Sequence, residues 1–471
     1  MDDELCFAGA RELAAMLREG QVSAREVTRA HLERIAAVNP EINAVVTLTA
    51  DLALARAAEA DRRHAAGEHL GPLHGLPVAH KDSRLTKGVR TTFGSPIFSG
   101  NVPETDDLVV QRMAAAGAIM VGKTNLPEFG AGSHTFNPLF GPTRNPYDLS
   151  RSSGGSSGGA AAGLAAGMFS LADGSDMGGS LRNPASFCNV VGLRPSPGRV
   201  PEFPDTTSWA PLGVSGPLAR SVSDLSLLLS VLAGPDPRVP LSIQRSGRAY
   251  ADPPLSDVAG LRVAWSADLG GAVPVDSEVT DALAPAPRVF SDLGCEVTQD
   301  CPSFAGADEA FLTLRAWEFE LGLGPLLDSR RDDLKPWLAW NIEQGRALRG
   351  SDVGRAERLR TELFGRVHEF FERYDVLLLP VSQVVPFPVE QEYPAIVAGQ
   401  QMPTYLDWMR SCYYVSVTSC PALSVPAGFT THGLPVGLQI VGRHLDEATV
   451  LRAGLAFEQA TGYGTRRPAS C

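Results

Sequence analysis

Two serines stand out because each follows a pair of glycines. Ser156 closes the Gly-Gly-Ser sequence of residues 154–156, and Ser180 closes that of residues 178–180. Paired glycines allow positive φ angles and let the main chain approach a ligand closely, so each serine occupies a turn that few other sequences can form. We therefore expect both hydroxyl groups to point into one site, as in a serine-based hydrolase.

The second turn also predicts a set of main-chain donors. The consecutive amides of Met177, Gly178, Gly179 and Ser180 could point the same way and hold a negatively charged oxygen. Residues 158–167, rich in Ala and Gly, suit a helix packed on a sheet. A flexible Gly/Ser linker is the alternative, but a linker would lack the apolar segment that separates the two turns.

Lys81 is the candidate base. Residues 76–80 read as a short strand that ends at this lysine, and Asp82 follows it. Strand alternation sends His80 and Lys81 to opposite faces, so only one of them should enter a site. The alternative is an ordinary surface cation, which is the usual environment of a lysine.

Residues 117–124 match the phosphate-loop pattern GxxxxGK[ST] letter for letter. In a true phosphate loop the variable positions form the cradle after the strand has ended. Here those positions are Ala-Ile-Met-Val, which form the strand itself, and Pro127 follows soon after. We therefore interpret this match as coincidental.

The composition narrows the class of protein. The formal net charge of -12 over 471 residues argues against nucleic acid as the main partner, because phosphate binding needs a basic surface. The acidic start is unlike a secretory signal, and no apolar run approaches the roughly 20 residues of a membrane span. Seven scattered cysteines without a CxxC pair favour reduced thiols and argue against a zinc site. We therefore expect a cytoplasmic protein.

The flanking segments predict an α/β protein with a large, mostly parallel sheet and helices on its faces. Residues 261–265, 276–293 and 296–298 repeat the strand-helix-strand rhythm of such folds. Residues 1–65 read as a helical N-terminal arm packed on a main domain of residues 66–471. This arm carries no obvious chemistry and could serve as scaffold or as the contact of a homodimer.

Three classes of function fit these residues. The first is a serine hydrolase whose base is Lys81. The second is an α/β-hydrolase esterase using Ser156, because residues 154–158 also satisfy GxSxG, with His368, His432 or His444 as base. The third is a non-enzymatic or nucleotide-binding protein, already weakened by the interpretation of residues 117–124.

The chain is identified as resembling the amidase signature family. Its signature region is similar to residues 154–159 and 174–195 of this sequence, and further similarity covers residues 75–82, 121–125, 216–224 and 433–442. The resemblance runs from about residue 65 to the end, with about 300–420 least alike. It also explains the false phosphate loop, since Gly-Lys-Thr-Asn is common there in the family.

The resemblance implies a Ser-Ser-Lys site in one compact α/β domain around a large mixed sheet, with no metal and no cofactor. The family's lysine falls on Lys81, its bridging serine on Ser156 and its nucleophile on Ser180. It also implies a cis peptide bond between Gly155 and Ser156. The activity implied is hydrolysis of carboxylic acid amides through an acyl-enzyme.

The chemistry requires an uncharged lysine. Burial disfavours the charged form of an amine and lowers its pKa, so the site must exclude water around Lys81, and activity should be highest on the alkaline side. Ser157, Asp176 and Arg182 are expected supports of the turns, or merely local stabilisers. Met177 departs from the Thr or Ile common in the family, but only its main-chain N–H is needed.

The substrate is less determined. Phe129, Trp209 and Tyr413 could line the cleft and favour an aryl or bulky acyl amide, an ester or a carbamate, although each could equally be a core aromatic. Gly130 falls where the family contacts the acyl group with its main chain. The rival within the family is the glutaminase subunit of a tRNA-dependent amidotransferase, which needs an acidic and a basic residue to hold glutamine.

Overall fold

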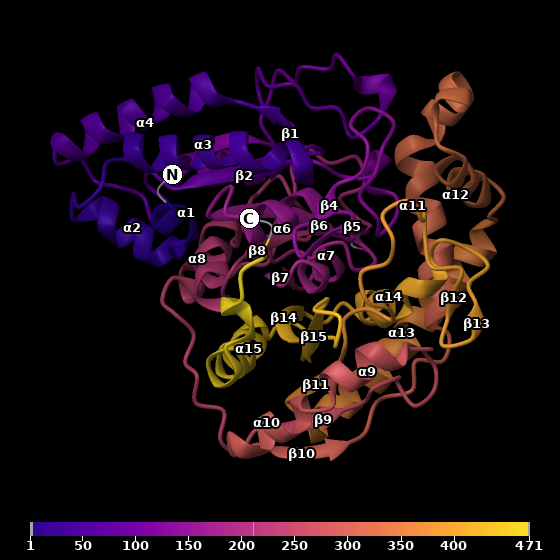
Figure 1. Cartoon of the computed structure of the whole chain (residues 1–471). Helices are drawn as coiled ribbons and strands as arrows, with labels where there is room; N and C mark the ends of the chain where they lie inside the picture. Colours follow the sequence, from indigo (N-terminus) through magenta and orange to yellow (C-terminus); the bar gives the residue numbers. More distant parts are fainter. Residues whose placement is uncertain (1–2, 211, 470–471) are drawn as a thin grey trace.

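The computed structural model describes residues 3–210 and 212–469. One large sheet runs through the molecule, and helices lie on its faces (Figure 1). In spatial order its strands are β1 (Val45–Leu48), β3 (Ile119–Thr124), β2 (Pro77–Lys81), β6 (Leu171–Asp176), β8 (Val214–Ala219), β7 (Val191–Arg194), β14 (Ala422–Phe429), β15 (Pro435–Gly442), β11 (Val376–Pro380), β9 (Arg262–Trp265) and β10 (Glu296–Gln299). Two short pairs lie outside it: β4 (Arg144–Asn145) with β5 (Asp148–Ser152), and β12 (Ile396–Val397) with β13 (Gln400–Gln401).

The helices fill the intervals between strands. They are α1 (Asp3–Phe7), α2 (Ala10–Arg18), α3 (Ala24–Ile42), α4 (Ala50–Ala65), α5 (Leu108–Ala115), α6 (Gly158–Ala165), α7 (Arg182–Phe187), α8 (Val222–Leu232), α9 (Ser277–Leu283), α10 (Ala286–Asp292), α11 (Ala307–Arg330), α12 (Pro336–Arg346), α13 (Gly350–Arg373), α14 (Arg410–Val417) and α15 (Glu447–Thr461). Short 3₁₀ turns span Pro96–Phe98, Glu128–Gly130, Gly247–Tyr250, Arg331–Asp333, Asp407–Met409 and Tyr463–Thr465.

The sheet is mixed, as predicted, and the fold is a single α/β unit. The prediction that parallel pairs would predominate is wrong. Within the described residues, β3–β2, β2–β6, β11–β9 and β9–β10 are parallel, whereas the other six neighbouring pairs are antiparallel. One reason is the direct connection of β14 to β15 through residues 430–434, since a short turn can join only antiparallel strands.

Residues 3–65 are mainly helical and contribute one strand to the main sheet. β1 lies between α3 and α4 and pairs with β3 in an antiparallel register, Val45 facing Thr124. Side chains of this segment, such as Leu13 and Val27, belong to the same buried cluster as Val78 of β2. The four helices gather at one end of the molecule in Figure 1. The segment is thus packed closely on the rest of the chain, whereas a domain boundary at residue 65 stays a prediction.

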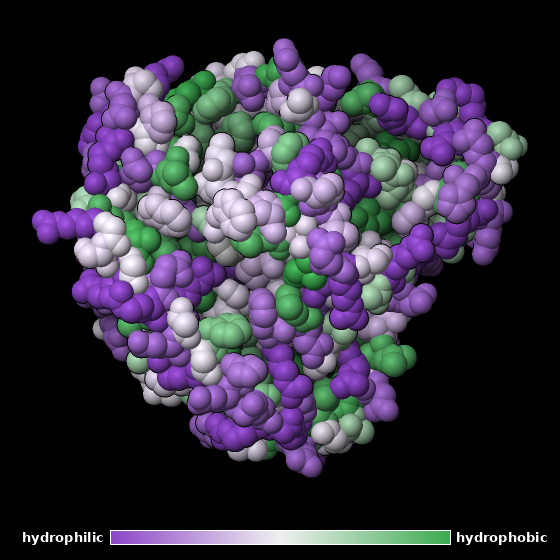
Figure 2. Space-filling model, turned by 180° about the vertical axis from the view of Figure 1, so that it is seen from behind, coloured by the Kyte–Doolittle hydropathy of each residue, from purple (hydrophilic) through white to green (hydrophobic). Residues whose placement is uncertain are grey.

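A second buried cluster lies between the sheet and the helices α11, α13 and α14. Among the described residues, none of the helices combines the length and apolar character that crossing a membrane requires. On the face shown in Figure 2, hydrophilic residues predominate and hydrophobic residues lie scattered between them.

Candidate active site

Strand β2 delivers Lys81 into the interior of the molecule. All five residues of this strand are buried between β3 and β6, and the Lys81 side chain has no exposed surface. Its Nζ atom lies 2.7 Å from Ser156 Oγ and 3.0 Å from Ser175 Oγ. The preceding His80 instead places Nδ1 2.5 Å from Asp173 Oδ2. As strand alternation predicts, only Lys81 reaches Ser156 and Ser175.

The environment of Lys81 favours an uncharged amine. Burial, together with the positive charge of Arg84, lowers its pKa from the ordinary value to about 7. The carboxylates of Asp173, Asp176 and Glu202 act in the opposite direction. Near neutral pH a large fraction of the amine is therefore unprotonated and able to accept a proton.

The main chain around Ser156 is tightly enclosed. The Gly155–Ser156 peptide bond is cis, which agrees with the family pattern, and Gly154 has a φ of 71°. A Cβ atom on Gly155 would lie 2.9 Å from main-chain atoms of Ser133 and His134, so only glycine fits. The position of the Ser156 hydroxyl beside Lys81 thus depends on the paired glycines that the sequence shows.

Ser180 follows the end of β6. Gly179 has a φ of 113°, and α7 begins two residues after Ser180. Ser180 is partly exposed, and it lines the same cleft as Ser156. The N–H of Ser157 donates to the Ser180 carbonyl oxygen at 3.2 Å, which ties the two glycine turns together.

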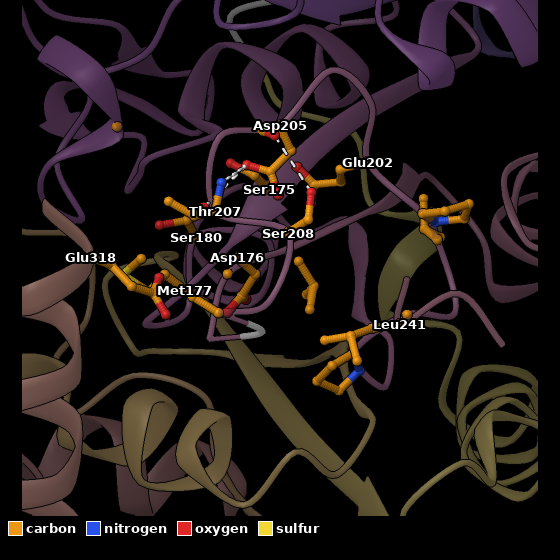
Figure 3. Close-up of a pocket in the computed structure, with 18 of the residues that line it drawn as sticks. Ser175, Asp176, Met177, Ser180, Glu202, Asp205, Thr207, Ser208, Leu241 and Glu318 are labelled. Atoms are coloured by element: carbon orange, nitrogen blue, oxygen red, sulfur yellow. Dashed lines mark hydrogen bonds between the residues drawn. The ribbon is translucent and has the colours of Figure 1, made fainter. Parts of the chain in front are cut away.

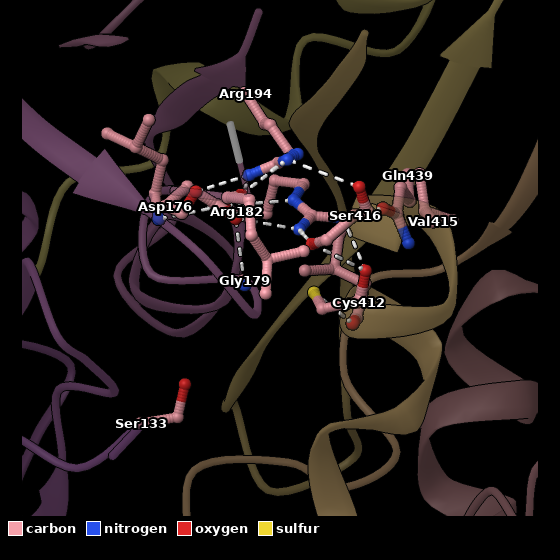
Figure 4. Close-up of polar contacts among 12 residues, drawn as sticks. Ser133, Asp176, Gly179, Arg182, Arg194, Cys412, Val415, Ser416 and Gln439 are labelled. Atoms are coloured by element: carbon pink, nitrogen blue, oxygen red, sulfur yellow. Dashed lines mark hydrogen bonds and ion pairs between the residues drawn. The ribbon is translucent and has the colours of Figure 1, made fainter. Parts of the chain in front are cut away.

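Asp176 clamps the second turn (Figure 4). Its Oδ1 accepts from the Gly179 N–H at 2.9 Å, and its Oδ2 accepts from the Leu181 N–H at 3.1 Å. Arg182 donates to both oxygens, at 2.8 and 3.0 Å, and Arg194 donates to Oδ1 at 3.3 Å and to the Asp176 carbonyl. Although burial opposes it, these two guanidinium groups hold the pKa of Asp176 well below its ordinary value. Asp176 and Arg182 therefore hold the second turn through hydrogen bonds, and their support of catalysis stays a prediction.

This clamp revises the predicted set of oxyanion donors. The Gly179 N–H donates to Asp176, so it is not available to bind an oxyanion. The amides of Met177, Gly178 and Ser180 remain candidates. Gly178 packs closely against Phe311, because a Cβ atom on this residue would lie 2.9 Å from the phenylalanine ring.

A cleft of about 240 Å³ opens in front of the serines (Figure 3). Ser156, Ser175 and Ser180 line this cleft, and so do Phe129 and Gly130. A Cβ atom on Gly130 would lie 3.5 Å from Ser156 Oγ, which shows how near its main chain comes to the hydroxyl. A small amide fits the dimensions of such a site.

Two predicted substrate contacts are placed elsewhere. Tyr413 has no exposed surface, stacks on Phe311 with 4.2 Å between ring centroids, and donates its hydroxyl to Asp308 at 2.5 Å. It is a core residue, so the prediction that it lines the cleft is wrong. Trp209 is 76% exposed and lies outside the cleft lining, although its neighbours Ser208 and Ala210 belong to it.

The cleft also contains residues that the sequence did not single out. Ser175 is the second hydrogen-bond partner of Lys81, and Glu202, Arg315 and Glu318 line the walls. Ser175 precedes Asp176 in β6, and the sequence shows only this. The pairing of β6 with β2 was needed to show that Ser175 reaches Lys81. Arg315 and Glu318 come from α11, and nothing in that helix distinguishes them in the sequence.

The alternative sites do not form. Lys123 of the phosphate-loop match is buried within β3 and donates to Thr86 Oγ1 at 3.0 Å and Thr91 Oγ1 at 2.9 Å. His368 and His444 both pack against the ring of Phe364, and His432 lies in the turn between β14 and β15. None of these three histidines lines the cleft, so the histidine-dependent arrangement with Ser156 is wrong.

A lysine buried against a serine, on a large mixed sheet, is an arrangement that suits a serine hydrolase. Comparison with known proteins identifies the family. The family model described as Amidase matches residues 26–451. The chain is 38% identical to an acylamidase of Rhodococcus erythropolis, over 99% of this chain and 98% of that protein.

A second relative is a glutamyl-tRNA(Gln) amidotransferase subunit from Thermosynechococcus vestitus, 36% identical over 97% of this chain and 99% of that protein. The crystal structure of a bacterial aryl acylamidase of the amidase signature enzymes superposes with a TM-score of 0.91 at 30% identity, covering 98% and 97% of the two chains. The chain therefore belongs to the amidase signature family. It is an amidohydrolase, an enzyme that acts on the C–N bonds of linear amides.

Proposed function

We propose that this protein hydrolyses aryl or bulky acyl amides through an acyl-enzyme on Ser180, with Ser156 and Lys81 as proton relay. The observation that carries the proposal is the Lys81 amine, fully buried and 2.7 Å from Ser156 Oγ, in a cleft that Ser180 also lines. A lysine in this environment can act as a base at neutral pH, whereas an exposed lysine is protonated.

The reaction follows from these positions. Ser180 Oγ attacks the acyl carbonyl while its proton passes through the Ser156 hydroxyl to Lys81. The oxyanion is held by main-chain N–H groups of residues 177, 178 and 180, each worth about 3 kcal/mol of barrier in related acyl-transfer sites. The proton returns by the same relay to the leaving amine, which must be protonated to depart. Water then attacks the carbonyl of the acyl-enzyme and gives a proton through the relay to Lys81, and this proton returns to Ser180 Oγ as the carboxylic acid departs.

The cleft wall supports an aryl or bulky substrate. Phe129 stacks with Phe93 at 6.1 Å and meets Phe98 edge-on at 5.9 Å, so its ring is held firmly at the cleft. Phe319 and Met177 extend this apolar wall. The similarity to an acylamidase and to an aryl acylamidase structure supports the same substrate class. Esters and carbamates with comparable groups are proposed as side substrates.

The second candidate is a glutaminase subunit of a tRNA-dependent amidotransferase. It is favoured by the 36% identity to an amidotransferase subunit over nearly the whole chain. The aromatic wall around Phe129 favours the amidase instead, because free glutamine has no ring to place there.

A panel of anilides, aliphatic amides, glutamine, esters and aryl carbamates, assayed on the purified chain, tests the proposal. Ser180→Ala is the control for turnover at this site. Cleavage of anilides that Ser180→Ala abolishes supports the amidase, whereas hydrolysis of glutamine without activity on anilides reverses the preference. The cytoplasmic location and the homodimer stay predictions.

A further inference from the structure

Arg315 is a buried guanidinium on the cleft wall that lacks a carboxylate partner. Its side chain comes from α11, is 5% exposed and lines the same cleft as Ser180. One N–H donates to the hydroxyl of Tyr405 at 2.8 Å, and another to the thioether sulfur of Met177 at 3.2 Å, a weak acceptor. Nε is buried without a hydrogen-bond partner, and within residues 3–210 and 212–469 the group forms no ion pair.

The nearest acidic residue on the same helix does not neutralise this charge. Glu318 follows one turn later, lines the cleft and lies beside Met177 in Figure 3. Burial raises its pKa to about 8, despite the opposing effect of the Leu212 N–H and of the positive charges on Arg360 and Arg315. At neutral pH its carboxyl group is therefore largely protonated.

The other carboxylates of the cleft are engaged elsewhere. Glu202 pairs with Arg84 at 3.5 Å, and Asp205 accepts from the N–H of Thr207 at 2.9 Å. In Figure 3 both lie on the other side of Ser180 from Glu318. The two walls of the cleft thus differ in charge, and the wall formed by α11 carries an uncompensated cation. A buried charge without a partner is strongly unfavourable, so a bound anion would be strongly attracted to this position.

The surroundings of Arg315 also orient it. Its Cζ lies 4.0 Å from the ring centroid of Phe319, and the Tyr405 hydroxyl holds one end of the guanidinium. Phe319, Phe129 and Met177 belong to one apolar cluster. A planar cation fixed above an aromatic wall suits a ligand with a carbon skeleton that ends in a carboxylate.

We propose that Arg315 binds a carboxylate carried by the substrate, so that the cleft prefers amides bearing an acid group over their neutral analogues. This inference rests on the proposed amidase function and names its substrate class. The acid group lies on the part of the substrate that faces Phe129 and Phe319, with the scissile carbonyl at Ser180.

Two matched substrate pairs test the inference. The first pair is the mono-4-nitroanilide of glutaric acid and the 4-nitroanilide of pentanoic acid, which differ in a terminal carboxylate on the acyl part. The second pair is 4-acetamidobenzoate and 4-methylacetanilide, which differ on the amine part. The wild-type protein should show a kcat/KM at least about tenfold higher for the acid member of one pair, as expected for a charge-assisted hydrogen bond.

Substitution assigns this preference to Arg315. Arg315→Met should lower kcat/KM for the preferred acid by about tenfold to hundredfold, mainly through KM, and leave the neutral analogue within about threefold. Arg315→Lys keeps the charge and should retain part of the preference. Arg358→Met removes an exposed positive charge from α13 and should change neither substrate. Equal rates for acid and neutral members in both pairs would overturn the inference, as would an equal loss for both in Arg315→Met.

Binding without turnover separates this inference from the proposed reaction. Ser180→Ala protein is titrated calorimetrically with the glutaric and benzoic acid probes, and the titration is repeated in Ser180→Ala/Arg315→Met. Binding that depends on Arg315 supports the acid site even if no amide is cleaved. Cleavage of neutral anilides without any acid preference upholds the amidase and rejects the acid site.

Discussion

The Nζ atom of Lys81 lies 2.7 Å from the Oγ atom of Ser156, and the lysine side chain has no exposed surface. This contact joins an amine with a lowered pKa to a hydroxyl that shares a cleft with Ser180. In the proposed mechanism this lysine is the base, and the role of each group can be tested by substitution.

Replacing Lys81 should remove the base. Lys81→Met should lower kcat/KM for an acyl anilide by about 10² to 10⁴, the usual contribution of general base catalysis. His368→Ala, His432→Ala and His444→Ala are the matched controls and should keep wild-type rates, because none of these residues lines the cleft. Steady-state kinetics decide whether the base is Lys81 or a histidine. A large loss of kcat/KM in a histidine variant, with Lys81→Met still active, would show that Lys81 is not the base.

Two charges near Lys81 should move the acid limb of the pH profile in opposite directions. Arg84 disfavours the protonated amine, so Arg84→Met should raise the pKa of Lys81 and shift the limb to higher pH. Glu202 favours the protonated amine, so Glu202→Gln should shift the limb to lower pH. Activity needs the unprotonated form, which accumulates as pH rises through the pKa.

The pH dependence of kcat/KM, measured for both single variants and the double variant, checks this prediction. Asp173 and Asp176 also act on Lys81 and stay unchanged in all three proteins. The double variant should lie close to the wild type. Shifts of the same sign in both single variants would contradict the electrostatic role.

The buried pair of Asp176 and Arg182 should be important for stability. Asp176→Asn leaves Arg182 and Arg194 buried without their counterion, and breaking such a buried pair typically costs about 3 to 5 kcal/mol of unfolding free energy. Because the pKa of Asp176 is lowered in the folded state, this stabilisation is complete above about pH 4 and is lost as pH falls below it.

Urea unfolding at neutral pH measures the effect. Asp292→Asn, which breaks the exposed pair of Asp292 with Arg288, is the control and should cost no more than about 1 kcal/mol. A similar small loss for Asp176→Asn would show that the clamp does not support the fold.

Phe129 and Tyr413 should respond differently to substitution. Phe129→Ala removes a ring from the cleft lining and should lower kcat/KM for an anilide by about tenfold to 150-fold, corresponding to about 1.5 to 3 kcal/mol of buried aromatic contact. Acetamide, which lacks a ring, should be affected much less. Tyr413→Phe removes only the hydrogen bond to Asp308 and should leave both rates unchanged, with about 0.5 to 1.5 kcal/mol less stability. Equal losses in the two variants would contradict these placements.

The sequence predicted the parts of the site that depend on local geometry. Ser156 and Ser180 follow glycine pairs that only certain turns accept, and Lys81 ends a short apolar strand, so these positions could be recognised without coordinates. The rejection of the phosphate-loop match followed in the same way from the apolar residues of the strand that precedes Lys123. The direction of each strand could not be predicted so well, because the antiparallel pairing of β6 with β8 depends on contacts between distant segments.

The residues that sequence reasoning missed reach the cleft through tertiary packing. Arg315 and Glu318 lie on a long helix that packs against α12 and α13, and the face it turns toward Ser180 is set by these neighbours. Tyr413 was predicted to line the cleft and is instead a core residue. The sequence alone does not distinguish an aromatic residue in the core from one in a cleft. The engagement of the Gly179 N–H by Asp176 is a matter of a single hydrogen bond, which composition cannot reveal.

The rate at which a fluorophosphonate probe labels Ser180, measured from about pH 5 to pH 10, tests most directly whether Lys81 acts as an uncharged base. In the wild type the rate should rise with an apparent pKa near 7, and in Lys81→Met it should be low and independent of pH. A rate that rises only near the pKa of an exposed lysine, about 10.4, or equal labelling of Lys81→Met, would contradict the proposed relay.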